Sequence, residues 1–289
     1  MSAAESFLAR VSADARLASE RRAERLPLDA LRGQARAAPP ARGLRAAIAR
    51  RGPEQRGPDR GVALIAEVKR RSPSKGDLRP DLDPAGLAGA YQRGGASAIS
   101  VLTEPLHFGG GPEDLRAVRA AVPLPVLRKD FVTTPYQVWE ARAWGADAVL
   151  LIVAALDGEQ LADLLAEAAR AGLDALVEVH TREEAAVAAK VGATLVGVNA
   201  RDLATLTVDL GRFAAVRDAL PAGATIVAES GIRTSADVQA AAGAGADAVL
   251  VGETLVLADD PAATAASLLA GNDASTKDGG TWLSRGRSS

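Results

Sequence analysis

The chain has 289 residues, 48% of them apolar, and a formal net charge of −2 at pH 7. This charge argues against a general nucleic-acid-binding protein, and the absence of cysteine excludes disulfides, cysteine-based metal sites and thiol catalysis. The longest apolar run, residues 148–156, is about half as long as a membrane span, and no secretory signal is apparent. We therefore expect a cytoplasmic protein with no membrane partner.

The first part of the chain has a pattern of its own. Phe7, Leu8 and Val11 have helical spacing among many arginines. Leu44, Ala47 and Ile48 also have helical spacing. We interpret residues 1–60 as a helical extension that packs on the main domain and ends in a linker from residue 52 to residue 61.

A short motif then recurs along the chain. Gly145-Ala-Asp-Ala-Val-Leu-Leu151 returns as Gly245-Ala-Asp-Ala-Val-Leu-Val251, and weaker copies begin at Gly95, Gly172 and Gly192. In each copy, glycine ends a helical segment and a short apolar run follows. The copies are spaced by about one helix plus one strand, which predicts parallel strands joined by crossover helices.

Eight such units account for most of the chain. Strands are predicted near 62–68, 97–102, 124–128, 147–153, 174–179, 194–198, 224–229 and 247–251. Helices are predicted near 83–93, 112–121, 134–144, 157–171, 181–191, 209–219, 234–243 and 261–270. These units predict an α/β fold, a (β/α)8 TIM barrel over residues 61–270, followed by a polar tail at 271–289 that we expect to be disordered.

An open doubly wound sheet is the alternative fold. Such a sheet is usually shorter and carries a glycine-rich phosphate loop after its first strand. Here that position holds Lys69-Arg-Arg-Ser-Pro-Ser74, which favours the barrel.

Lysine is rare in this chain and stands at informative positions. Only five of the 34 basic residues are lysines, and two of them, Lys69 and Lys129, end predicted strands, with Lys75 in the loop after the first. An ammonium group can donate its proton, whereas a guanidinium does not under ordinary conditions. Lys69 and Lys129 are therefore candidates for proton transfer or for binding an anion.

Polar residues cluster where the predicted strands end. In a barrel of this type, the carboxyl ends of the strands form the active site. The residues at these ends are Glu67, Lys69, Thr103, Glu104, Phe108, Lys129, Phe131, Glu178, Asn199, Arg201, Glu229, Ser230, Gly231, Gly252 and Glu253. The glycines after the seventh and eighth strands also fit a phosphate site, because barrels often bind phosphate between these two loops.

The two histidines are less informative. His107 and His180 lack partners at metal-ligand spacing. We expect the side chain of His180 to point away from that of Glu178 and to have a structural place, in the core or on the surface.

Taken together, several segments resemble the indole-3-glycerol phosphate synthase family, over residues 5–270. The matching stretches are 65–76, 100–105 with Phe108, 125–131, 150–152, 176–179, 197–203, 228–232 and 250–253. The Glu-x-Lys-x-x-Ser-Pro-Ser segment at 67–74 is highly specific. Where the family often has Asn-Asn-Arg-Asn, this chain has Asn199-Ala-Arg-Asp202, so only Asn199 and Arg201 are assigned by the resemblance.

The resemblance implies a substrate and three catalytic residues. The family closes the ring of 1-(2-carboxyphenylamino)-1-deoxyribulose 5-phosphate and releases CO2 and water to form indole-3-glycerol phosphate. Lys129 would be the general acid and Glu178 the general base. Lys69 would hold the departing carboxylate together with Arg201, and would also serve as an acid in dehydration. Rearomatisation drives the decarboxylation, so no cofactor and no metal are implied.

The resemblance also implies the substrate contacts. The residues that would orient hydroxyls and lysines are Glu67, Asn199 and Glu229. The apolar slot for the aromatic ring would be formed by Phe108, Phe131 and Leu150. The phosphate would be bound by Ser72, Ser230, Gly231, Gly252 and Glu253, the last two through backbone N–H groups. We expect a monomer that needs no protein partner.

Three other functions remain open at this point. One is an aldolase in which Lys129 forms a Schiff base with a sugar phosphate. Another is the isomerase that precedes the synthase step, although this enzyme is expected to use a Cys–Asp pair and the chain has no cysteine. The third is a non-catalytic barrel that binds a phosphosugar.

Overall fold

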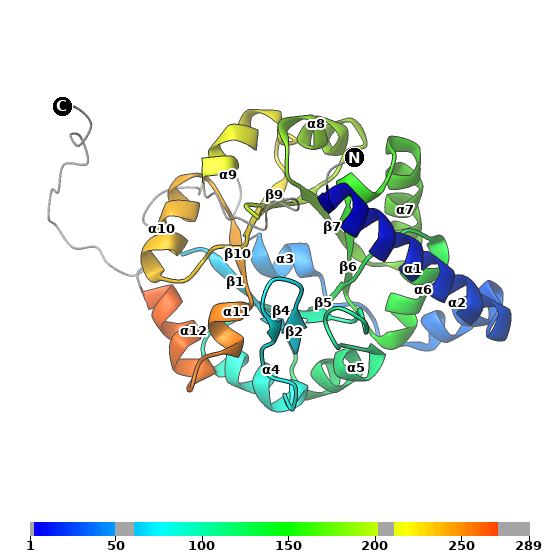
Figure 1. Ribbon diagram of the computed structural model, residues 1–289, viewed down its shortest axis with the longest axis horizontal. Coiled ribbons are helices and arrows are strands. Elements are labelled where there is room, and N and C mark those ends of the chain that lie inside the picture. Colours follow the sequence, from blue (N-terminus) through cyan, green and yellow to red (C-terminus); the bar gives the residue numbers. More distant parts are fainter. Residues whose placement is uncertain (1–2, 50–60, 202–210, 271–289) are drawn as a thin grey trace, which may run out of the picture.

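The computed structural model describes residues 3–49, 61–201 and 211–270. In these residues, eight parallel strands close into a barrel surrounded by helices (Figure 1), which confirms the predicted (β/α)8 fold. The strands around the barrel are, in order, β1 (Ala63–Val68), β4 (Ala98–Leu102), β5 (Val126–Lys129), β6 (Ala148–Ile152), β7 (Asp174–Val179), β8 (Leu195–Asn199), β9 (Thr225–Glu229) and β10 (Ala248–Val251), which pairs with β1.

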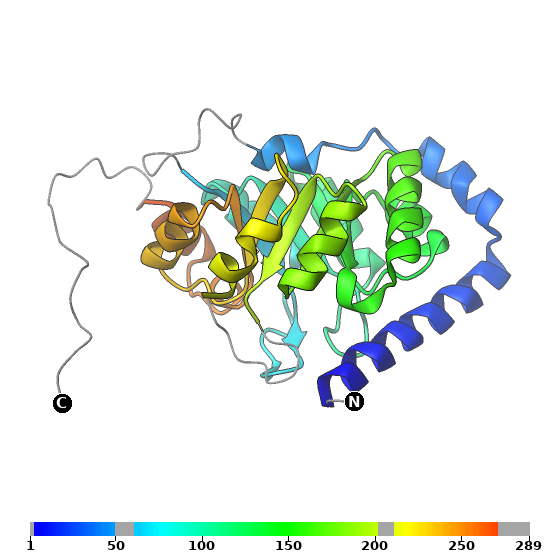
Figure 2. The same ribbon diagram turned by 90° about the horizontal axis from the view of Figure 1, so that it is seen from above.

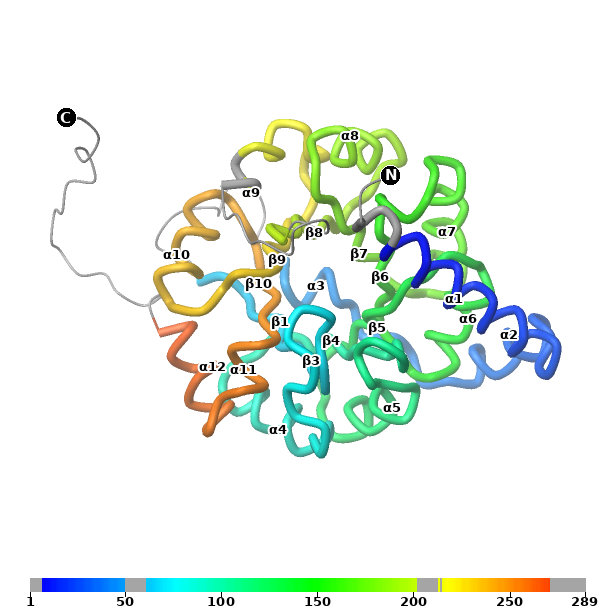
Figure 3. The backbone as a smooth tube through the Cα atoms, viewed as in Figure 1, coloured from blue at the N-terminus to red at the C-terminus, as the bar shows by residue number. Residues whose placement is uncertain are grey.

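The helices form the outer ring, as the backbone trace in Figure 3 shows. The main helices are α4 (Pro84–Arg93), α5 (Pro112–Ala121), α6 (Pro135–Trp144), α7 (Gly158–Ala171), α8 (Arg182–Lys190), α9 (Gly211–Val216), α10 (Ser235–Gly243) and α12 (Pro261–Ala270). Shorter helices are η2 (Val153–Ala155), η3 (Arg217–Ala219) and α11 (Glu253–Val256). The predicted linker at 52–60, the start of the helix predicted at 209, and the tail from 271 lie outside the described residues.

Local sequence explains where several helices begin and end. At the start of α6, the Thr134 hydroxyl accepts the Gln137 backbone N–H, and the Gln137 side chain accepts the Thr134 N–H, which satisfies two N–H groups that the helix leaves unpaired. At its end, Gly145 takes a left-handed conformation with φ of 95°, which glycine adopts without steric cost.

The aspartates of the repeated motif have the same role in two copies. Asp147 precedes β6, and its carboxylate accepts the Val126 N–H at 2.7 Å. Asp247 precedes β10, and its carboxylate accepts the Ile226 N–H at 2.8 Å. The backbone N–H of Asp147 also donates to the carbonyl of Val126, and that of Asp247 donates to the carbonyl of Ile226. The motif thus ties each of these strands to the preceding one.

Alternation along the strands produces two apolar clusters. Every second residue of a strand points outward and packs against the helices. Leu64 on β1 and Leu151 on β6 are examples. The residues between them fill the barrel interior, and these include Ile65, Leu150 and Leu176. The interior cluster ends in charged residues near the carboxyl ends of the strands, so the pattern that builds the core also positions the polar site.

The predicted helical extension contains α1 (Ala3–Arg25), α2 (Leu28–Ala37) and α3 (Leu44–Ile48). Leu44 and Ile48 of α3 are fully buried in the interior cluster, and α3 covers the end of the barrel where the strands begin. Figure 2 shows the amino-terminal part of α1 at the opposite end of the barrel, the end that also carries a small hairpin of β2 (Arg71–Ser72) and β3 (Gly76–Asp77). The sequence did not predict this hairpin.

Candidate active site

A cavity of about 450 Å³ lies at the carboxyl ends of the strands, which is within the usual size range for small-ligand sites. Every residue that the family resemblance assigned to the site lines this cavity. These residues are Glu67, Lys69, Ser72, Phe108, Lys129, Phe131, Leu150, Glu178, Asn199, Arg201, Glu229, Ser230, Gly231, Gly252 and Glu253. Lys69 and Lys129, which are 60 positions apart, therefore reach one space. Thr103 and Glu104 follow β4 directly but do not line the cavity.

Lys129 lies between two buried carboxylates. Its Nζ is 2.8 Å from Oε2 of Glu178 and 3.2 Å from Oε2 of Glu229. Burial alone would lower the pKa of Lys129, but the negative charge of Glu178 and the surrounding carboxyl groups outweigh burial and raise the pKa above its ordinary value. Lys129 is therefore charged in the resting site and has a proton to give.

The two carboxylates beside Lys129 differ in acidity. Burial opposes ionisation of Glu178, but the charges of Lys129 and His180 and hydrogen bonds from Lys129 and Asn199 lower its pKa. Burial raises the pKa of Glu229 to about 8, and the charge of Glu178 adds to this effect. We conclude that Glu178 carries the negative charge while Glu229 tends to hold a proton, because two adjacent carboxylates do not readily ionise together.

Two glycines make room for these side chains. A Cβ on Gly197 of β8 would collide with Oε1 of Glu229. A Cβ on Gly252 would collide with Oε1 of Glu67 and lie 2.9 Å from Nζ of Lys69. Lys69 and Glu67 form an ion pair with a distance of 2.8 Å. A side chain at position 197 or 252 would therefore displace these charged groups.

One side of the cavity suits an anion. Ser230 and Gly231 both have positive φ, 69° and 81°, and the Ser230 hydroxyl donates to Oδ1 of Asn199 at 2.8 Å. Gly252 and Glu253 lie at the start of α11 next to them, and the Glu253 carboxylate pairs with Lys75 at 2.6 Å. This pair neutralises the one acidic side chain that the sequence places at the predicted phosphate site.

The other side of the cavity is apolar. The rings of Phe108 and Phe131 lie 6.3 Å apart between centroids, and Leu150 lies in the floor. Phe7 and Leu8 of α1 complete this wall, and the Phe7 ring meets His107 edge-on at 5.2 Å. The sequence predicted that Phe7 and Leu8 are helical but did not assign them to the site.

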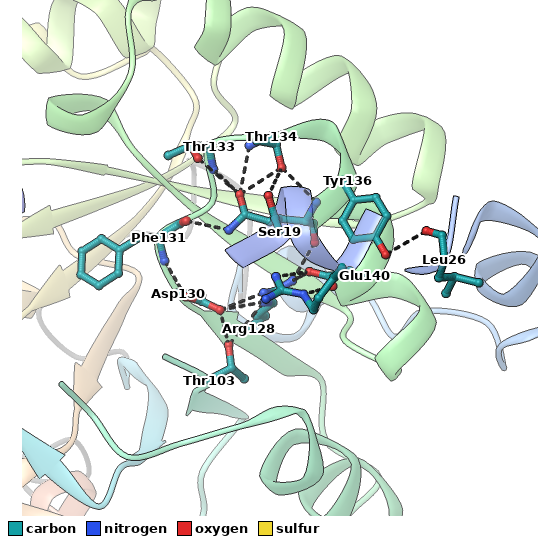
Figure 4. Close-up of polar contacts among 12 residues, drawn as sticks. Ser19, Leu26, Thr103, Arg128, Asp130, Phe131, Thr133, Thr134, Tyr136 and Glu140 are labelled. Carbon is teal, nitrogen blue, oxygen red and sulfur yellow. Dashed lines mark hydrogen bonds and ion pairs between the residues drawn. The ribbon is translucent and has the colours of Figure 1, made fainter. Parts of the chain in front are cut away.

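A buried polar network supports β5 behind the site (Figure 4). Arg128 is 1% exposed, and its Nη2 is 2.8 Å from Oδ2 of Asp130. Asp130 in turn accepts the Phe131 N–H at 2.8 Å and the Thr103 hydroxyl at 2.7 Å. Since Arg128 and Asp130 flank Lys129 in sequence, they fix the backbone that carries Lys129 and Phe131.

The same network reaches the amino-terminal helix. Arg22 of α1 donates twice to Glu140 of α6, at 2.5 and 2.8 Å, and the Ser19 hydroxyl lies 3.2 Å from that of Thr134. The Tyr136 hydroxyl donates to the Leu26 carbonyl at 3.1 Å (Figure 4). These contacts attach α1 to the β5–α6 region, so the helix that carries Phe7 is joined to the strand that carries Lys129.

The predicted orientation of His180 is wrong, whereas its place in the core was one of the two that the sequence predicted. Its Nε2 lies 3.4 Å from Oε1 of Glu178, and its Nδ1 lies 3.3 Å from Oε2 of Glu184. Side chains two positions apart on an extended chain share a face, so the spacing from Glu178 to His180 was the signal that should have placed the two side chains together.

Metal-ion sites and membrane-spanning helices were sought in the part of the chain that the structure describes. No set of three or more His, Cys, Asp or Glu side chains there is arranged to hold a metal ion. Among residues 3–49, 61–201 and 211–270, no helix is both long enough and apolar enough to cross a membrane.

A closed (β/α)8 barrel with a lysine between two carboxylates, in a cavity at the carboxyl ends of its strands, has the architecture of a (β/α)8 enzyme. Comparison with solved structures agrees with the barrel. Thiamine phosphate pyrophosphorylase from Pyrococcus furiosus matches with a TM-score of 0.55 and 19% identity, over 71% of this chain and 93% of that one. Orotidine 5'-phosphate decarboxylase from Pyrococcus horikoshii matches with a TM-score of 0.55 and 16% identity, over 71% and 97%. At these identities, the likeness shows the fold alone.

Sequence comparison is more specific. The family model described as indole-3-glycerol phosphate synthase matches residues 8–268. The protein named indole-3-glycerol phosphate synthase from Mycolicibacterium smegmatis is 54% identical, over 84% of this chain and 86% of its own length. That from Kineococcus radiotolerans is 55% identical, over 84% and 87%. The chain belongs to the indole-3-glycerol phosphate synthase family.

Proposed function

We propose that this chain converts 1-(2-carboxyphenylamino)-1-deoxyribulose 5-phosphate to indole-3-glycerol phosphate, CO2 and water in tryptophan biosynthesis. The aromatic carbon that bears the carboxylate attacks the ketose carbonyl and forms the new ring. Loss of CO2 returns the electrons of the broken bond to the six-membered ring and restores its aromaticity. Loss of the new hydroxyl together with a proton, as water, completes the indole. The observation that carries the proposal is the position of Lys129, between two carboxylates in a cavity with an apolar and an anion-binding side.

Lys129 is the general acid in this proposal. Ring closure develops negative charge on the carbonyl oxygen, and an ammonium in a site shielded from water stabilises such charge strongly. The Lys129 side chain is 14% exposed, and it retains its proton because the neighbouring carboxylates raise its pKa. It therefore offers both the charge and the proton that the step needs.

Glu178 is the general base. While Lys129 is charged, the pair keeps Glu178 ionised but makes it a weak base, because its pKa lies low. Once Lys129 has given its proton to the substrate, this stabilisation is lost and Glu178 becomes more basic. The proton on the ring carbon can then move to Glu178 during the later deprotonation and dehydration.

The remaining cavity residues bind the substrate. Lys69 and Arg201 hold the carboxylate that leaves as CO2, and Lys69 also assists dehydration. Residues that orient hydroxyls and the two lysines are Glu67, Asn199 and Glu229. The aromatic ring lies in the slot of Phe108, Phe131 and Leu150. The phosphate is bound by Ser72, Ser230, Gly231 and the backbone N–H groups of Gly252 and Glu253.

We further propose that one chain is sufficient for the reaction, because all of these residues belong to a single chain. A phosphorylated biosynthetic substrate is consistent with a cytoplasmic enzyme.

A direct assay tests the proposal. The purified protein is mixed with the anthranilate-derived ribulose phosphate, and indole fluorescence is followed with time. We expect multiple turnovers in the wild type and a loss of at least about 10²-fold in Glu178→Gln, because the base is removed at nearly constant shape. No indole fluorescence from the wild type would refute the proposal. Covalent trapping of Lys129 by borohydride with a ketose phosphate would instead support a Schiff-base aldolase.

A further inference from the structure

His180 is a buried titratable residue that the reaction above does not use. It follows β7 directly and is 6% exposed. Its backbone N–H donates to Oε2 of Glu184 at 2.7 Å, and its Nδ1 lies 3.3 Å from the same oxygen. Glu184, in the first turn of α8, therefore holds both the main chain and the ring of His180 and leaves Nε2 beside Glu178.

Nε2 of His180 and Nζ of Lys129 lie near different oxygens of the catalytic carboxylate. Nε2 lies 3.4 Å from Oε1 of Glu178, whereas Lys129 contacts Oε2 at 2.8 Å. The two oxygens of Glu178 thus lie near two basic residues, although Nε2 of His180 forms no hydrogen bond at this position and its contact with Glu178 is one of charge. A positive charge beside each oxygen favours one orientation of the carboxylate, which a general base needs because proton transfer depends on distance and angle.

Three carboxylates face the His180 ring. They come from Glu178 on β7, Glu184 on α8 and Glu229 on β9, and Lys129 on β5 lies beyond Glu178. Burial lowers the pKa of His180, but the hydrogen bond to Glu184 and the charges of Glu178 and Glu184 outweigh this effect and raise it. In the protonated ring, both nitrogens carry hydrogen, so both can donate to the carboxylates they face.

We propose that His180 is a positioning residue of the reaction, which links Glu178 to Glu184 and fixes the orientation of the catalytic base. The proposal rests on the proposed function, because it takes Glu178 to be that base. It predicts that the ring nitrogen facing Glu178 matters more for turnover than the nitrogen facing Glu184.

A pair of amide variants separates the two nitrogens. The side-chain amide nitrogen of His180→Gln can occupy the place of Nε2, whereas that of His180→Asn can occupy only the place of Nδ1. We expect kcat to fall by about tenfold or more in His180→Asn, with KM within about twofold, because a displaced catalytic group slows the chemical step more than binding. His180→Gln should recover most of this loss. Equal kcat values in the two variants would overturn the proposal.

A second measurement does not depend on activity or on the folding of the His180 variants. The chain has only two histidines, so long-range ¹H–¹⁵N spectra contain two imidazole patterns, and His107→Gln assigns them. We expect Glu178→Gln to lower the pKa of His180 by at least about half a unit, because one facing negative charge is lost. Glu183→Gln is the matched control, because Glu183 lies on α8 and is fully exposed.

The two measurements have distinct failures. A His180 pKa that is the same in the wild type and in Glu178→Gln would overturn the link to Glu178, whatever the enzyme turns over. If the pKa responds but the wild type produces no indole fluorescence, the proposed function fails while the contact between the two side chains stands. In that case the assigned role of His180 in turnover fails with the function.

Discussion

The two ends of the barrel are made from the same strands but differ in chemistry. Where the strands begin, the interior is closed by Leu44 and Ile48 of α3, which are fully buried among small and apolar residues. Where they end, the same inward-facing positions hold Glu67, Lys129 and Glu178. One end stabilises the fold, and the other holds buried charges that cost free energy unless they are paired.

This contrast predicts that substitutions at the two ends have separate effects. Changes at the charged end should alter turnover more than stability, and changes at the α3 end should do the reverse. Four experiments test this separation.

The largest effect on turnover is expected from Lys129→Arg. The positive charge between the carboxylates survives, but the readily donated proton does not, so kcat should fall by more than ~10²-fold. Steady-state assays measure the loss, and thermal unfolding checks that the fold is retained. Near-normal turnover would remove Lys129 from the role of general acid.

The largest effect on stability is expected from Leu44→Ala at the opposite end. Truncating a fully buried leucine costs about 2–5 kcal/mol in the free energy of unfolding, whereas kcat/KM below the unfolding transition should change less than about twofold. Urea unfolding measures the cost. Leu17→Ala is the matched control, because Leu17 is 51% exposed and should lose less than about 0.5 kcal/mol. A large loss of kcat/KM in Leu44→Ala would show that the two ends are coupled.

A smaller effect on turnover is expected from Gly197→Ala. The added methyl group would collide with Oε1 of Glu229 and displace that carboxylate from Lys129, so kcat should fall by about tenfold. Gly158→Ala is the control, because a methyl group added there would meet no other atom within 4 Å. Equal activity of the two variants would show that the position of Glu229 does not matter for turnover.

The smallest effect concerns the pH dependence of stability. Because the pKa of Glu229 is raised to about 8 from an ordinary 4.5, its contribution to stability is present below pH 4.5 and is lost as the pH rises toward 8. Relative to Glu229→Gln, which stays neutral, the wild type should therefore lose about 1–3 kcal/mol of unfolding free energy between pH 5 and pH 8.5. Urea unfolding of both proteins at both pH values measures this. A stability difference independent of pH would contradict the assignment of the proton to Glu229.

Much of the fold could be predicted because the chain repeats one helix and one strand. The predicted start of α5 at residue 112 and the bounds of β7 at 174–179 agree with the structure, since capping residues and glycines mark such ends. The hairpin of β2 and β3 was missed because two-residue strands have no periodicity to detect.

The site was predicted as far as alternation along a strand allows. Lys69 follows Glu67 by two positions, so the two share a face and reach the cavity together. The same rule, correctly applied, would have joined His180 to Glu178. It could not place Phe7 and Leu8 in the cavity wall, because their position depends on how α1 packs against α6. Nor could it show that Arg128, which faces away from the cavity, is fully buried.

The paired aspartates of the repeated motif have one more consequence. Asp147, before β6, binds the start of β5, and Asp247, before β10, binds the start of β9. The strands β5 and β9 lie diametrically opposite each other, four places apart around the barrel. A slip of either strand by one residue would turn its whole row of side chains over, and Lys129 or Glu229 would then point into the helical shell. The two aspartates, at the end of the barrel where the strands begin, thus fix the register of β5 and β9, on which the position of Lys129 and Glu229 at the other end depends.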